Sequence, residues 1–233
     1  MKSTVFRLVA FGLLAFWCAP DTAVAQSPSA SMLTAAQVRE LVARAEPADH
    51  ARLRAHFEAL SARYEADAKR HSNVGRAFTA NPNRRSAANP TRHHERLAEL
   101  ATQEAATTRE LATHHGQLAV GVPSVAPPDS ERFDRGEGAL ALLPEAQLIA
   151  LAGKANTPAE HGALQEHYLA LAAQYESQTA DHLAMGRMYR ANPNRRGADP
   201  ATHCDRLVRL SREAAGEARA IAAEHEQMAR GAT

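Results

Sequence analysis

The sequence repeats itself, and this repeat limits the possible folds more than any other feature. Residues 50–71 align without a gap with residues 161–182, and the string ANPNRR occurs at 80–85 and again at 191–196. NPTRHHERL at 89–97 then matches DPATHCDRL at 199–207. Such self-similarity is the signature of two copies of one structural unit. We therefore predict helical repeats at 31–119 and 139–230.

The segments outside the repeats have different characters. Lys2 and Arg7 form a basic start, residues 11–17 are apolar, and Ala23-Val24-Ala25 is a small-residue cleavage motif. This pattern predicts a signal peptide at 1–25 and a periplasmic or secreted protein after cleavage near Ala25. Residues 120–138 are rich in proline and glycine without apolar periodicity, which is typical of a linker.

Charge and composition exclude several classes of function. Removing Lys2, Arg7 and Asp21 from 27 basic and 26 acidic residues leaves 25 of each, so the mature chain has no net charge. This balance argues against a general nucleic-acid binder. No apolar run beyond the signal approaches about 20 residues, so we predict no transmembrane segment. Cys204 is the one cysteine after the signal, which excludes an intrachain disulfide.

Each repeat reads as one short helix followed by a long helical hairpin. Thr34 with Gln37 has the spacing of a capping box, and Pro144 suits a first helical turn. The long helices are expected to begin near Pro47 and Pro158 and to end at Asn-Pro 81–82 and 192–193, where proline cannot continue them. The second long helices open at Asn-Pro 89–90 and Asp-Pro 199–200. The predicted fold is all-α, a duplicated helical hairpin forming an antiparallel four-helix bundle with two short accessory helices.

A stripe of aromatic and histidine residues identifies the expected core face. It recurs every seven residues in both copies: His50, Phe57, Tyr64, His71 and Phe78, then His161, Tyr168, Tyr175, His182 and Tyr189. A seven-residue period keeps side chains on one face of a helix. In the second long helix, His93, Leu97, Leu100, Leu111 and His115 supply the matching face, while His56 and His167 lie about 100° away and are expected to flank it.

The histidines suggest transition-metal sites at the two ends of the bundle. All 12 lie inside the repeats, and imidazole is the commonest protein ligand for Zn, Cu and Ni. Thioether and thiolate neighbours would favour Cu(I). We expect one polar layer at the hairpin turns (His71, His93, Met185, His182, His203 and Cys204) and another at the far end (His50, His115, His161 and His225).

Two other interpretations stay open. The histidines could serve structural hydrogen bonds, or the bundle could be a metal-free interaction scaffold that binds a client protein. LTAAQ at 33–37, partly echoed by LPEAQ at 143–147, resembles the LTxxQ motif of small periplasmic helical stress proteins. That resemblance implies an envelope location and a metal-responsive or chaperone-like role.

Further motifs are missing from the sequence. It has no CxxCH for covalent haem, no HExxH, and no convincing nucleophile or phosphate-loop motif, so we do not expect an enzyme. Whether the hairpins pack within one chain or swap between chains of an oligomer is open at this point, as are the roles of Cys204 and of the ANPNRR loops.

Overall fold

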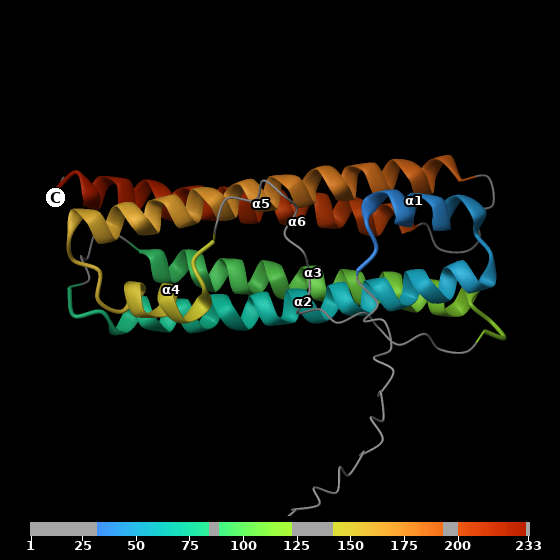
Figure 1. Ribbon diagram of the computed structural model, residues 1–233, viewed down its shortest axis with the longest axis horizontal. Helices are drawn as coiled ribbons and strands as arrows, with labels where there is room; N and C mark the ends of the chain where they lie inside the picture. The colour runs from blue at the N-terminus through green and yellow to red at the C-terminus, as the bar shows by residue number, and fades with distance from the viewer. Residues whose placement is uncertain (1–31, 84–88, 123–141, 193–199, 232–233) are drawn as a thin grey trace, which may run out of the picture.

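The computed structural model describes residues 32–83, 89–122, 142–192 and 200–231, which form six α-helices (Figure 1). The predicted signal peptide and most of the predicted linker lie outside these residues. The helices are α1 (Ala35–Arg44), α2 (Pro47–Ala80), α3 (Pro90–Leu118), α4 (Glu145–Ala152), α5 (Pro158–Ala191) and α6 (Pro200–Ala229). The described residues contain no strand and no helix long and apolar enough to span a membrane.

Local sequence signals set the helix ends. Thr34 and Gln37 form the predicted capping box, and Thr157 forms a second one with Glu160, so α1 and α5 each begin with two backbone N–H groups bonded to side chains. Proline stands in the first turn of α2 and of α5, and both helices stop directly before Asn-Pro. α4 begins at Glu145, with Pro144 as its cap rather than its first residue.

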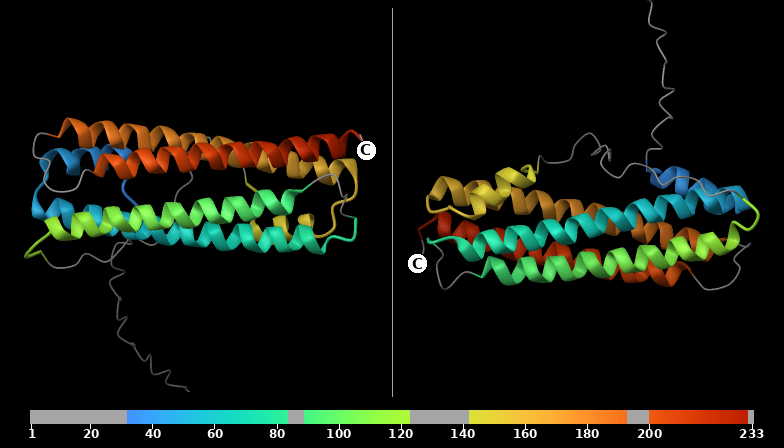
Figure 2. Two further views of the ribbon diagram at one scale, coloured as in Figure 1. Left: turned by 180° about the vertical axis from the view of Figure 1, so that it is seen from behind. Right: turned by 90° about the horizontal axis from the view of Figure 1, so that it is seen from below.

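The predicted antiparallel four-helix bundle is confirmed. α2 packs along α3 and α5 along α6, and the two hairpins meet where α3 lies against α6 (Figures 1 and 2). The short helices α1 and α4 each contact both α2 and α5. They cover the opposite side of the bundle, one towards each end. At 1.5 Å per residue, the 34-residue helices α2 and α5 are about 50 Å long.

The two hairpins run end for end, so the turn of each lies beside the open end of the other. The backbone N–H of Asn89, at the first turn, donates to Glu224 near the end of α6. The side chain of Asn192, at the second turn, donates to the carbonyl oxygen of Val42, 2.8 Å away, near the end of α1. The predicted layer joining both hairpin turns is therefore wrong, because those turns lie at opposite ends of the bundle.

The heptad stripe forms the interior, as predicted. Phe57 and Tyr168 are fully buried, and Tyr64 and Tyr175 are 2% and 5% exposed. Leucines from all four long helices fill the same core. Burying one such side chain contributes about 1.5–3 kcal/mol. Within this apolar core, eight of the sixteen buried polar residues are histidines.

Candidate functional site

A chain of two histidines and two tyrosines crosses the interior at one end of the bundle. His71 on α2 and His94 on α3 face each other, with their Nδ1 atoms 3.4 Å apart. His71 Nε2 lies 2.9 Å from the hydroxyl of Tyr175, and His94 Nε2 lies 2.7 Å from that of Tyr168. The tyrosines come from α5, so this chain joins one hairpin to the other.

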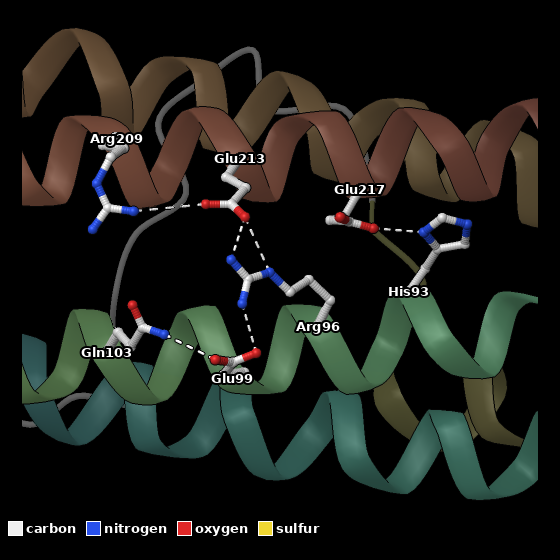
Figure 3. Close-up of polar contacts among 7 residues, drawn as sticks. All are labelled: His93, Arg96, Glu99, Gln103, Arg209, Glu213 and Glu217. Carbon is white, nitrogen blue, oxygen red and sulfur yellow. Dashed lines mark hydrogen bonds and ion pairs between the residues drawn. The ribbon is translucent and has the colours of Figure 1, made fainter.

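His94 takes the place that we predicted for His93. His94 is fully buried, whereas His93 lies at the edge of the α3–α6 contact, with its Nδ1 atom 2.5 Å from Glu217 (Figure 3). One residue is a rotation of about 100° on a helix, which is enough to exchange core and rim. The repeat carried a signal for this residue, because His94 aligns with Cys204, which was already a candidate.

The rim of the α3–α6 contact is an ionic zone. Arg96 on α3 bridges Glu213 on α6 and Glu99 on its own helix, next to the His93–Glu217 contact (Figure 3). At the other end, His203 on α6 lies 3.0 Å from Glu110 on α3. His93 and His203 thus contact carboxylates between the hairpins instead of joining the interior imidazoles.

Two further imidazole pairs occupy the open ends of the hairpins. His50 and His115 place their Nδ1 atoms 3.0 Å apart, and His115 Nε2 lies 2.7 Å from the hydroxyl of Tyr189. In the second repeat, the Nδ1 atoms of His161 and His225 are 3.3 Å apart. Both pairs were predicted to lie at the far end of their hairpins, but the end-for-end packing places them at opposite ends of the bundle.

Three buried imidazole nitrogens have no hydrogen-bond partner among the described residues, and one of them, His203 Nδ1, lies within ion-pair distance of Glu110. Divergence between the repeats explains the other two. His225 Nε2 is one of them. The Tyr189 hydroxyl contacts the equivalent nitrogen of His115, but the residue that aligns with Tyr189 and lies next to His225 is Phe78, which has no hydroxyl. His182 Nδ1 is the other; its repeat counterpart, His71 Nδ1, faces His94, which aligns with Cys204. The Nε2 atom of His182 contacts the hydroxyl of Tyr64 at 3.1 Å.

We predict that exchanging one hydroxyl will change stability in opposite directions at these matched positions. Tyr189→Phe removes the partner of His115 Nε2 and is expected to cost about 1–3 kcal/mol of unfolding free energy. Phe78→Tyr offers a hydroxyl to His225 Nε2 and is expected to add about 1 kcal/mol. Urea denaturation at pH 7.5 measures both. Equal destabilisation by the two variants would contradict this account of the pairs.

His56 and His167 are also interior residues, which corrects their predicted flanking position. Each is 6% exposed. His56 Nδ1 accepts a hydrogen bond from the backbone N–H of Leu33 at 3.3 Å, and His167 Nδ1 accepts one from Leu143 at 3.1 Å. These histidines fix the chain just before α1 and α4, and so hold the accessory helices on the bundle.

Burial keeps the interior imidazoles neutral. Desolvation lowers the pKa of His71 and His225 to about 3, and that of His182 to about 4. For His94 and His115, burial and neighbouring histidines together lower the pKa well below its ordinary value. A neutral imidazole has a nitrogen lone pair free to accept a proton or to bind a metal ion at neutral pH.

The two sulfur candidates lie near the turn of the second hairpin. Cys204 is a fully buried thiol, and its Cβ atom lies 3.2 Å from the point where a Cβ on Gly186 would stand. A larger residue at Gly186 would push α5 away from α6 here. Met185 is 7% exposed and lines a cavity beneath α1 together with His182.

A second cavity, of about 330 Å³, opens beside the pair formed by His50 and His115. His50, His114, His115 and Tyr189 are among the residues that line it. His50 is only half-buried, so this pair lies closest to the surface of the three. Nowhere in the described ranges do three histidine, cysteine, aspartate or glutamate side chains come together as a metal-binding group. The imidazoles therefore form pairs, and the predicted layers that join histidines of both hairpins at each end are not formed.

The comparisons with known proteins add nothing to this geometry. Neither the family models, nor the curated proteins, nor the solved structures gave a match to this chain. Its function therefore has to be argued from the buried histidines and the cavities beside them.

Proposed function

We propose that this chain is an exported helical-bundle protein that binds transition-metal ions at buried imidazole pairs. One observation carries this proposal: at three places, imidazoles from the two helices of a hairpin hold their Nδ1 atoms 3.0–3.4 Å apart. Two nitrogens bound to one tetrahedral ion at 2.0–2.1 Å would be about 3.3 Å apart. An ion could therefore take the place of the shared hydrogen with little movement of either helix, and the displaced proton would be carried on Nε2 of the same ring as the other neutral tautomer.

The pair formed by His50 and His115 is the best placed to receive an ion. The cavity beside it gives access from the surface and leaves room for water molecules as further ligands. His114 lines the same cavity and is the nearest source of a third nitrogen. Imidazole ligands suit Zn, Cu and Ni. The basic and apolar start of the sequence supports export, although it lies outside the described residues.

A metal-free scaffold is the second candidate, and the tyrosine contacts favour it. In the His71–His94 chain, both imidazoles use both nitrogens in contacts within the bundle. The capping box at Thr34 also gives a purely structural reason for the LTxxQ-like motif. Such a protein would protect an unfolding client at equal molarity, and adding a chelator would not reduce the protection.

Calorimetric titration of untagged protein with Zn²⁺, Ni²⁺ and Cu²⁺ tests the first candidate. We expect about one tightly bound ion per chain, at the pair formed by His50 and His115, and His50→Gln is expected to lower the affinity for this ion at least about 10-fold. His93→Gln is the matched control, because it removes a histidine that contacts carboxylates instead of a second imidazole. Absence of a stoichiometric ion, or equal weakening by the control, would reject metal binding at the pairs.

A further inference from the structure

The cavity beneath α1 gathers most of the methionines of this protein. It has a volume of about 380 Å³, and Met32, Met185 and Met188 all line it. The sequence has five methionines, so three of the five line this one cavity. Met32 precedes α1, whereas Met185 and Met188 lie one turn apart on α5, so the sulfur atoms come from two sides of the cavity.

The other repeat shows what this cavity looks like without sulfur. The equivalent positions beneath α4 carry Leu142, Val74 and Ala77, and the cavity there has only about 80 Å³. Both cavities keep the same histidines, because His56 and His182 align with His167 and His71. The three methionines and the larger space therefore distinguish the cavity under α1 from its repeat counterpart.

An imidazole with an unpartnered nitrogen forms part of the wall of this cavity. His182 lines the cavity and is 4% exposed, and its Nδ1 atom has no hydrogen-bond partner in the part of the chain that the structure describes. His182, Met185 and Met188 follow one another at intervals of three residues, which places them on one side of α5. Leaving such a nitrogen unpaired costs free energy, which a bound ligand would recover.

We propose that this cavity binds Cu(I), with His182 Nδ1 and the thioethers of Met32, Met185 and Met188 as ligands. Thioether sulfur is a soft ligand, which selects Cu(I) over Zn²⁺ and Mg²⁺. All four ligands are neutral, so the complex with Cu(I) would carry only the single positive charge of the ion.

The charged residues around the cavity nearly balance one another. Arg39, Arg63 and Asp181 line it, and the guanidinium of Arg63 lies 4.0 Å from the carboxylate of Asp67. These charges therefore do not select between ions of different charge, and the preference for Cu(I) rests on the thioethers. The cavity shares no histidine with the imidazole pairs, and this inference relies only on the premise that the bundle interior accepts a metal ion.

Anaerobic titration of the full chain with Cu(I), in competition with the colorimetric chelator bicinchoninate, tests the site. We expect one equivalent per chain, and Met185→Leu/Met188→Leu is expected to weaken binding at least about 100-fold. Leucine nearly conserves the volume of methionine, so the fold should survive, which circular dichroism checks. Met228→Leu is the matched control and should leave the affinity unchanged. X-ray absorption at the copper edge should show sulfur neighbours in the wild type and fewer in the double variant.

Two outcomes would overturn the inference: equal Cu(I) affinity of the wild type and the folded double variant, or a copper spectrum with only nitrogen and oxygen neighbours. The same variants separate this site from the imidazole pairs. Met185→Leu/Met188→Leu should leave Zn²⁺ binding intact, and His50→Gln should leave Cu(I) binding intact. Loss of either site alone is therefore visible.

Discussion

Acidification is expected to unfold this protein cooperatively between about pH 6 and pH 4, because its core holds many neutral imidazoles. Burial is the main cause that lowers the pKa of seven of them: His56, His71, His94, His115, His167, His182 and His225. In the unfolded chain, each would titrate near its ordinary value of 6.5. Protonating any of them in place would put an unpaired charge into the core.

The sign of the effect follows from counting protons. Between pH 6.5 and the lowered pKa values, the unfolded chain binds protons that the folded chain does not, so the unfolding free energy falls as the pH falls. Each histidine contributes about 1.4 kcal/mol per pH unit. Glu104 opposes this slope by about one proton, because burial raises the pKa of its carboxyl to about 8, and the raised pKa of Asp67 acts in the same direction. The net slope is therefore at most about six protons, or about 8 kcal/mol per pH unit, against a typical total stability of about 5–15 kcal/mol.

Urea denaturation followed by circular dichroism at several pH values measures this slope. His167→Gln keeps an acceptor for the backbone N–H of Leu143 and removes one titrating group, so it should lower the slope by about 1.4 kcal/mol per pH unit. Adding His56→Gln should lower it by the same amount again. A wild-type slope below about two protons between pH 6 and pH 5 would mean that the imidazoles are not buried in the solution structure.

The helices could be predicted closely because their signals are local. Proline in the first turn, Asn-Pro after the last residue and a seven-residue stripe each act within a few residues of the position that they determine. The duplication then doubled every signal. The starts of α2 and α5 were predicted near Pro47 and Pro158, and the structure has them at these residues.

Which histidines contact one another could not be predicted from the same signals. The relative direction of the two hairpins depends on how α3 packs against α6, and no local motif encodes that choice. Placing His93 inside failed because one position decides between core and rim. A usable signal was present in residues that differ together between the repeats. His94 contacts Tyr168, and the two aligned positions both lose their hydrogen-bonding group, since they carry Cys204 and Phe57.

Replacing Glu104 by glutamine is expected to stabilise the protein at alkaline pH. Glu104 lies on α3 and is 1% exposed, and its Oε1 atom accepts a hydrogen bond from the hydroxyl of Ser211 at 2.8 Å. Burial raises the pKa of this carboxyl to about 8, with the Ser211 contact acting in the opposite direction. The folded chain therefore holds a proton that the unfolded chain releases near pH 4.5, and the contribution of Glu104 to stability declines as the pH rises from 4.5 to 8.

Glutamine keeps the oxygen that accepts from Ser211 and cannot ionise. Between pH 6 and pH 8.5, the unfolding free energy of Glu104→Gln relative to that of the wild type should therefore rise by about 2.5 kcal/mol, which urea denaturation at the two pH values measures. Ser211→Ala is the complementary variant: it removes a contact that lowers the pKa of Glu104, so the decline should extend to higher pH. If Glu104→Gln instead destabilises the protein equally at both pH values, the carboxylate is ionised in the folded state and has a partner that a neutral amide cannot serve. With both titrations in place, the histidines set the acid limit of stability and Glu104 the alkaline one, so the folded bundle should be most stable between about pH 7 and pH 7.5.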